Sequence, residues 1–188
     1  SAAGLYTLYN GMIAPLGDFG LRGALWYQCE SNTFEHARYA DLLRTLRGDW
    51  RQRSGARLPM LFVQLPNYGK PASKPGESDW AAMREAQRQV AAEDPRSGLV
   101  VAIDLGDRYD IHPANKQELG RRLARSARQA VYGEKLAAAG PVPASVTRNG
   151  DAVVVAFEGV ADALVAYGAD GPIGFELCGD TAGSCRYA

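Results

Sequence analysis

Hydrophobic positions along the chain form three near-continuous runs of strand length. They are RGALWYQ (22–28), LPMLFVQLP (58–66) and GLVVAIDLG (98–106). Runs that are apolar at nearly every position, rather than at alternate ones, are typical of strands buried on both faces of a parallel sheet. The pattern therefore predicts three central, parallel strands.

Segments with apolar residues at helical spacing follow these strands. The first starts near Glu35, and Asn32 three residues before it gives the form of a capping box. Ser78 is placed to cap a second helix, and Pro113 to open a third that stops near Gly133. Alternating strands and helices predict an α/β fold with right-handed crossovers. The apolar stripes are Tyr39, Leu42, Leu43, Leu46 and Trp50; Trp80, Met83 and Val90; and Leu119, Leu123, Ala127 and Val131.

The two ends of the chain depart from this alternation. AAAGPVPA (137–144) is predicted to be a linker, and SVTRNGDAVVVAFEG after it predicts a hairpin around an Asn-Gly turn. We therefore expect two units, residues 1–136 and a small β-rich segment over 145–188. Before residue 22 there is helical spacing at Leu5, Leu8, Tyr9 and Met12 but no strand, and three strands are few for a sheet, which usually has about four to six. We expect further strands upstream.

Composition and charge narrow the range of partners. The chain has 188 residues, 46% of them hydrophobic, which is enough to bury a core. Its 21 basic and 21 acidic residues leave no net charge, which argues against nucleic acid or an anionic membrane surface. No stretch approaches the roughly 18 apolar residues of a membrane span. The start lacks both an initiator Met and a signal-peptide pattern, so we expect a processed or truncated chain.

The three cysteines leave two interpretations open. Cys178 and Cys185 bracket the turn-rich segment CGDTAGSC, which fits either a disulfide in an oxidising compartment or two free thiols in a cytosolic protein. Cys29 stands apart and is expected to be unpaired. A metal site from Cys29, His36 and His112 has no supporting ligand spacing, and His36 is expected to be a solvated helix residue.

Polar side chains gather where the predicted strands end. The ligand site of an open α/β sheet lies beyond the carboxyl ends of its strands. That rule brings together three loops: QCESN (28–32), QLPNYG (64–69) and DLGDRYDIHP (104–113). We therefore expect the functional site among them.

His112 is the candidate general base of this site. A residue before proline is pushed toward extended geometry, so Asp110, two positions earlier, can project to the same side and hold the imidazole. Asp104 and Asp107 are competing carboxylates. An Asp-x-His sequence before Pro113 also fits a simple capping feature, and spacing alone leaves both interpretations open.

Ser31 is a candidate nucleophile for this site. The stretch LWYQCESN (25–32) shares the expected sheet edge with His112. It is not, however, the Gly-x-Ser-x-Gly elbow that exposes a serine at a sharp turn. Ser31 also lies at or just before a predicted helix start, where serine is common for backbone hydrogen bonding alone.

Residues 8–133 resemble the sialate O-acetylesterase group of the SGNH hydrolase superfamily, which includes carbohydrate acetylesterases. The resemblance rests on six blocks in order: LYNGMIAPL (8–16), RGALWYQCESN (22–32), DLLRTLRGDWR (41–51), LPMLFVQLPNY (58–68), REAQ (84–87) and DLGDRYDIHPANKQELGRRLA (104–124). It implies a three-layer, flavodoxin-like SGNH hydrolase fold with a parallel sheet that here lacks its first strands. Residues 1–136 would be the C-terminal portion of the catalytic domain.

The resemblance also implies roles for individual residues. In that family the catalytic serine belongs to a Gly-Gln-Ser-Asn block, followed by a glycine-rich oxyanion block, and neither is present in this sequence. The nucleophile would therefore come from an upstream segment, in the same gene product or a second chain, and Ser31 would not be it. His112 would be the general base, Asp110 its orienting acid, and Gln28 the amide near the oxyanion. The residues that would orient sugar hydroxyls are Glu30, Asn32, Gln64 and Asn67.

The expected activity is hydrolysis of O-acetyl esters on sugars, either acetylated sialic acids or acetylated plant polysaccharides. No metal, organic cofactor or nucleic acid is implied, and a secreted or periplasmic location is expected. Cys29 stands where the family has glycine, so its side chain needs space and, if that glycine has positive φ, a changed backbone. Two alternatives remain: a non-catalytic carbohydrate-binding remnant, and an interaction module that docks through residues from 145 onward.

Overall fold

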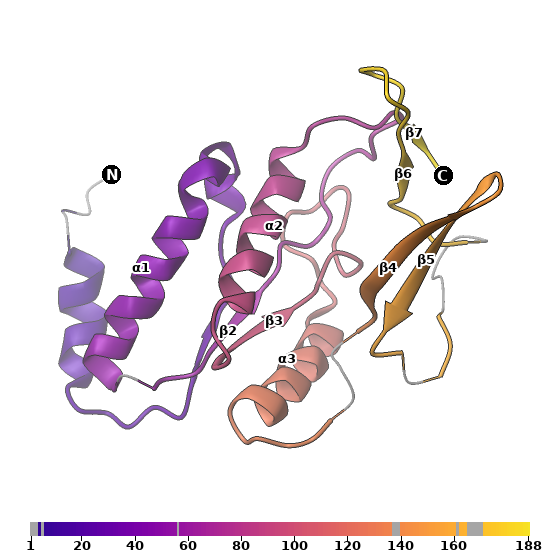
Figure 1. Cartoon of the computed structure of the whole chain (residues 1–188). Helices are drawn as coiled ribbons and strands as arrows, with labels where there is room; N and C mark the ends of the chain where they lie inside the picture. The colour runs from indigo at the N-terminus through magenta and orange to yellow at the C-terminus, as the bar shows by residue number, and fades with distance from the viewer. Residues whose placement is uncertain (1–3, 5, 56, 137–139, 161, 165–170) are drawn as a thin grey trace.

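The computed structural model describes residues 4, 6–55, 57–136, 140–160, 162–164 and 171–188. The chain begins with short helical turns, continues through an α/β unit and ends in β hairpins (Figure 1). The elements are η1 Tyr9–Ile13, η2 Ala14–Leu16, β1 Ala24–Trp26, η3 Glu30–Glu35, α1 His36–Ser54, β2 Met60–Val63, α2 Asp79–Ala92, β3 Ser97–Val100, α3 Lys116–Ala130, β4 Val142–Asn149, β5 Ala152–Glu158, β6 Glu176–Leu177 and β7 Arg186–Tyr187.

The central sheet has the order β1-β2-β3, and both pairs of strands are parallel. Trp26 lies opposite Phe62, which lies opposite Leu99 in β3. All residues of β2 are buried, as expected for the middle strand. The three predicted parallel strands are therefore confirmed, although each is shorter than the apolar run that predicted it.

Helices cover both faces of this sheet. Successive residues of a strand point to opposite faces, and in β2 Phe62 packs in one apolar cluster with Leu43 of α1 and Met83 of α2. Its neighbour Val63 packs in a second cluster with Leu119 of α3. The result is a three-layer α/β arrangement, with α1 and α2 on one side of the sheet and α3 on the other.

Side-chain caps fix the starts of two helices. The Ser78 hydroxyl accepts a hydrogen bond from the Ala81 N–H at 3.3 Å, which confirms the predicted cap of α2. The predicted start of the third helix at Pro113 is wrong. Asn115 Oδ1 accepts from the Glu118 N–H at 3.3 Å, so α3 begins with the residue after Asn115. An asparagine supplies the acceptor that a helix start needs, and the buried Pro113 belongs to the loop before it.

The predicted capping box of Asn32 and Glu35 is also wrong. A 3-10 helix, η3, occupies these positions, and α1 follows from His36 with no side-chain cap. At the N-terminus, the helical spacing corresponds to η1 and η2, and Leu8 and Met12 are exposed. The predicted position Leu5 lies outside the described residues.

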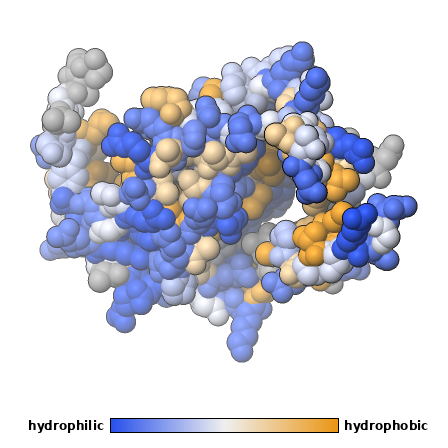
Figure 2. Space-filling model, turned by 45° about the horizontal axis from the view of Figure 1, so that its top comes forward, coloured by the Kyte–Doolittle hydropathy of each residue, from blue (hydrophilic) through white to orange (hydrophobic). Residues whose placement is uncertain are grey.

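The C-terminal part consists of two small antiparallel hairpins. Strands β4 and β5 pair around a turn with positive φ at Gly150, as the Asn-Gly sequence predicted. Figure 2 shows hydrophobic surface on the side of the molecule where this hairpin lies. The exposed valines of the hairpin include Val146 (66% exposed) and Val153 (47% exposed). Residues 137–139 of the predicted linker lie outside the described residues, and the division into two units stays a prediction.

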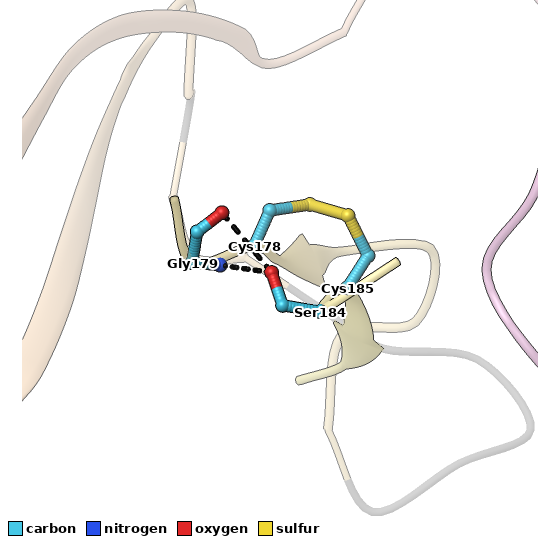
Figure 3. The surroundings of a disulfide bond; sticks show 4 residues. All are labelled: Cys178, Gly179, Ser184 and Cys185. Carbon is cyan, nitrogen blue, oxygen red and sulfur yellow. Dashed lines mark hydrogen bonds between the residues drawn. A yellow bond between two sulfur atoms is a disulfide. The ribbon is translucent and has the colours of Figure 1, made fainter. Parts of the chain in front are cut away.

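A disulfide joins Cys178 and Cys185, which confirms the oxidised interpretation of this pair (Figure 3). Inside the closed loop, the Gly179 N–H donates to Ser184 Oγ at 2.9 Å, and the same hydroxyl donates to the Gly179 carbonyl at 3.0 Å. The Tyr187 hydroxyl donates to the Lys74 carbonyl oxygen at 3.0 Å and links this segment to the loop before α2. None of the helices described combines the length and apolar character needed to cross a bilayer.

Candidate active site

The loops after β2 and β3 are held together at the carboxyl edge of the sheet. Asn67 Oδ1 accepts a hydrogen bond from the Gly106 N–H at 2.8 Å, and Tyr68 forms a parallel bridge with Asp107. A Cβ atom at Gly106 would lie 1.8 Å from the Asn67 carbonyl oxygen, so only glycine permits this approach. Two of the three loops predicted to converge therefore do so through direct contacts.

A buried glutamine, Gln87 of α2, ties the loop after β1 to the end of β2. Its Nε2 donates to the Val63 carbonyl at 3.0 Å and to Cys29 Sγ at 3.1 Å, and its Oε1 accepts from the Leu65 N–H at 3.0 Å. The side-chain amide thus pairs with one backbone carbonyl and one backbone N–H at the end of β2, as the backbone of a neighbouring strand would. The third predicted loop is thereby fixed at the same edge.

His112 projects into solvent from the loop after β3. Its side chain is 87% exposed, and its Nδ1 lies 3.4 Å from Asp110 Oδ1. The same carboxylate oxygen accepts from the His112 backbone N–H at 2.8 Å, which keeps the acid beside the imidazole. Close by in the chain, Lys116 Nζ lies 4.8 Å from the ring centre of Tyr27 at the end of β1. The start of α3, which follows the histidine loop, therefore borders the residue after β1.

The two competing carboxylates have other partners. Both oxygens of Asp104 accept from the Arg122 guanidinium at 2.7 Å, and these hydrogen bonds hold the pKa of Asp104 below its usual value. Asp107 Oδ1 accepts from the backbone N–H groups of Tyr109, at 2.7 Å, and Asp110, at 3.3 Å. Asp110 is thus the carboxylate that pairs with the imidazole in this structure.

The Gln28 side chain lies between two polar neighbours. Its Nε2 donates to Asn32 Oδ1 at 2.7 Å. On its other side, the Tyr39 hydroxyl lies 3.0 Å from the Gln28 backbone carbonyl oxygen and 3.4 Å from its Oε1. Tyr39 is only 3% exposed, and burial raises its pKa well above the usual value, so this hydroxyl stays a donor. Asn32 Nδ2 in turn lies 3.4 Å from Glu35 Oε2.

The other predicted sugar-binding side chains also have contacts within the protein. Glu30 Oε2 accepts from the Cys29 N–H at 3.0 Å. Gln64 is 9% exposed, and its Nε2 donates to the Arg84 carbonyl at 3.2 Å. The two asparagines have the partners described above. These contacts place all four residues at the strand ends, and their binding of sugar stays a prediction.

Cys29 keeps the backbone conformation that favours glycine. Its φ is 153° and its ψ is 1°, and its side chain is fully buried in the cluster that contains Tyr39 and Met83. Burial raises the pKa of the Cys29 thiol to about 12, so it is neutral at physiological pH. The structure therefore accommodates the side chain within the core at a positive φ.

Ser31 and the hypothetical metal ligands do not form a site with His112. Ser31 is exposed in η3 and, in the part of the chain that the structure describes, forms no hydrogen bond with the imidazole. His36 is partly exposed, with its Nδ1 3.1 Å from the Thr33 carbonyl oxygen. Among the described residues, three potential metal ligands come together only at Glu176 and the two disulfide-bonded cysteines, whose sulfurs are already bonded to each other.

The sequence predicted a core position for Tyr39 and a helix cap for Glu35, whereas both contact predicted site residues, Gln28 and Asn32. It gave no role to Gln87, which bonds to the strand ends beside them. One signal was present for Gln87, because it interrupts the apolar stripe of α2 between Met83 and Val90. A glutamine on the buried side of a helix must have hydrogen-bond partners, and these are the strand ends.

Comparisons with known proteins point to carbohydrate esterases. Residues 3–129 match a family model described as carbohydrate esterase, sialic acid-specific acetylesterase. Sialate O-acetylesterase from Mus musculus is 36% identical over 74% of this chain and 29% of its own length. The Homo sapiens protein of the same name is 33% identical over 74% of this chain and 30% of its own length.

A solved structure agrees with these matches. The crystal structure of a carbohydrate acetylesterase from Xanthomonas citri superposes with a TM-score of 0.81 at 36% identity, covering 96% of this chain and 42% of that one. The predicted three-layer α/β architecture of SGNH type is thereby confirmed. The chain spans about three tenths of the length of the curated relatives it matches.

Proposed function

Because the chain belongs to the sialic acid-specific acetylesterase family of carbohydrate esterases, we propose that it forms part of an enzyme that hydrolyses O-acetyl esters on sugars. One observation carries the proposal. An exposed imidazole, His112, is paired with Asp110 at the sheet edge where three polar loops converge. An exposed base with an orienting acid is the arrangement that activates a hydroxyl nucleophile.

The proposed reaction is acyl transfer through a serine. Asp110 faces Nδ1 of His112, so it favours the tautomer in which Nδ1 carries the hydrogen and Nε2 is free to accept one. The imidazole takes the proton of the serine hydroxyl as that oxygen attacks the acetyl carbonyl. It then gives the proton to the departing sugar oxygen, and water releases acetate in a second, equivalent step. No step needs a metal or cofactor.

The nucleophilic serine would come from an upstream segment, in the same gene product or a second chain. The open edge of β1 supports this proposal. Among the described strands β1 pairs only with β2, which leaves its other side without a neighbour. Leu25 of β1 is 62% exposed, whereas its counterpart in β2, Leu61, is 1% exposed. An added strand and its helix would cover both the edge and this side chain.

Gln28 would stabilise the tetrahedral oxyanion. One hydrogen of its Nε2 goes to Asn32, which leaves the other to donate. One such donor is worth about 3 to 4 kcal/mol of transition-state stabilisation. The residues proposed to orient the sugar are Glu30, Asn32, Gln64 and Asn67.

The proposed substrates are acetylated sialic acids or acetylated plant polysaccharides. The mouse and human relatives are named for the first class, and the Xanthomonas citri protein for carbohydrates in general. A secreted or periplasmic location is proposed as well, and the disulfide between Cys178 and Cys185 supports it because such bonds persist in oxidising compartments. The balanced charge of the chain argues against a nucleic-acid substrate.

The test compares two variants of the enzyme assembled with its upstream segment. His112→Ala should remove nearly all acetylesterase activity, whereas Ser31→Ala should keep most of it. Inactivity of Ser31→Ala with an active His112→Ala variant would overturn the assignment. Asp110→Asn should lower kcat by up to about 10⁴-fold by favouring the wrong tautomer, and Asp107→Asn is its matched control.

A non-catalytic glycan-binding protein is the second candidate. It would use the same polar side chains at the strand ends, Glu30, Asn32, Gln64 and Asn67, to hold a glycan without hydrolysing it. In that case the assembled protein would bind an acetylated glycan but release no acetate, and His112→Ala would leave the release rate at background. Calorimetry of glycan binding together with an acetate-release assay separates the two functions.

A further inference from the structure

We propose that Glu35 is a positioning residue that orients the side-chain amide of Gln28 through Asn32. This inference rests on the proposed function, in which Gln28 Nε2 faces the oxyanion. It assigns a task to the two residues whose spacing resembled a capping box but which cap no helix. The chain of contacts runs from Glu35 Oε2 to Asn32 Nδ2 at 3.4 Å, and from Asn32 Oδ1 to Gln28 Nε2 at 2.7 Å.

The orientation follows from which atoms can donate. A primary amide has a donor end and an acceptor end of nearly the same shape, so only its hydrogen-bond partners decide which way it points. An ionised carboxylate only accepts. Glu35 therefore requires the NH₂ group of Asn32 to face it, which turns Asn32 Oδ1 toward Gln28. Gln28 must then present its own NH₂ group to that oxygen.

The Tyr39 end of this series of hydrogen bonds favours the same orientation of the Gln28 amide. With Nε2 directed at Asn32, the carbonyl oxygen of Gln28 faces the buried Tyr39 hydroxyl at 3.4 Å. This hydroxyl shares its hydrogen between that oxygen and the Gln28 backbone carbonyl, which also fixes the position of the residue. A reversed amide would place Oε1 where Nε2 lies, and an oxygen there would repel a developing oxyanion.

The test is therefore to replace the hydrogen-bond acceptor at position 35 with a donor. Glu35→Lys replaces the acceptor with a group that only donates, so both amides should reverse. We expect kcat to fall about 10²-fold, close to the effect of removing an oxyanion donor, with KM changed little. Glu35→Gln should keep nearly full kcat, because its carbonyl oxygen can still accept from Asn32.

A second substitution should restore the polarity. In Asn32→Asp/Glu35→Lys, the lysine donates to the new carboxylate, which accepts from Gln28 Nε2 as Asn32 does now. We expect this double variant to recover at least tenfold in kcat over Glu35→Lys. Glu85→Lys is the matched control for charge, because Glu85 also pairs with an arginine three residues on, and it should leave kcat unchanged.

The experiment also separates this inference from the function on which it rests. The variants are measured in the assembled enzyme, alongside Gln28→Ala. If Gln28→Ala lowers kcat but Glu35→Lys does not, the positioning role is wrong. It is also wrong if Glu35→Lys lowers kcat by the same factor in the wild type and in the Gln28→Ala variant. If Gln28→Ala leaves kcat intact, the oxyanion assignment itself is wrong. Failure of Asn32→Asp to rescue Glu35→Lys would also overturn the positioning role.

Discussion

Substitution of Gln87 by leucine tests the contact that joins the strand ends. Leucine has a similar size but cannot hydrogen-bond, so the Leu65 N–H, the Val63 carbonyl and Cys29 Sγ all lose a partner. Leu65 is fully buried, and a buried N–H left unpaired costs about 1 to 3 kcal/mol.

Two lost hydrogen bonds and the apolar character of leucine also change the free energy of unfolding. Each of the other two hydrogen bonds contributes about 0.5 to 1.5 kcal/mol. The greater apolar character of leucine offsets about 1 kcal/mol of this loss. We therefore expect Gln87→Leu to lower the free energy of unfolding by about 1 to 5 kcal/mol.

Urea unfolding followed by circular dichroism measures this difference. With a slope near 2 kcal/mol per molar urea, the midpoint should fall by roughly 0.5 to 2.5 M. Gln89→Leu is the matched control, since Gln89 lies on the same helix but is exposed, and its side-chain amide donates to the exposed Glu85. Its effect should stay within about 0.5 kcal/mol. Equal midpoints for the two variants would refute the reasoning.

Three further predictions concern other parts of the molecule. Gly106→Ala should force the loops after β2 and β3 apart, because its Cβ would lie 1.8 Å from the Asn67 carbonyl oxygen, and a lower melting temperature together with lost esterase activity would show it. Above roughly pH 8.5 the unfolded thiol of Cys29 ionises while the buried one, with a pKa of about 12, stays protonated, so stability should fall by up to about 1.4 kcal/mol per pH unit. Chemical unfolding at pH 8, 9 and 10 should show this slope in the wild type and lose it in Cys29→Ala. Replacing Cys178 and Cys185 by serine should cost the C-terminal segment about 2.5 kcal/mol in loop entropy; hydrogen exchange should then be faster around that loop and unchanged in β2.

The strands were predictable because a buried parallel strand is apolar on both faces, but their ends were not. The third run continues to residue 106, whereas β3 ends at Val100. Beyond it Ala102 and Leu105 are still buried, at 1% and 8% exposure, because the loop packs against α3. Apolar residues that hold a loop to the core look the same in sequence as those of a strand.

The candidate site was predictable at the level of loops and not of contacts. Parallel strands bring their carboxyl ends to one edge, which was enough to group His112 with Gln28 and Asn67. Spacing did not distinguish a cap from a side-chain pair at Asn32 and Glu35, because both uses place an amide and a carboxylate three residues apart. The partners of Gln87 come from the end of β2 and from the loops after β1 and β2, and such long-range contacts leave no local pattern.

The open side of β1 also determines how this polypeptide behaves when it is produced alone. Unpaired N–H and C=O groups along a strand are a template for pairing with any other strand, including that of a second copy. Leu25, which is 62% exposed, adds apolar surface there whose burial favours association. We expect the purified chain to self-associate through this border as its concentration rises, and co-expression with the polypeptide that covers it to give a soluble, monodisperse preparation.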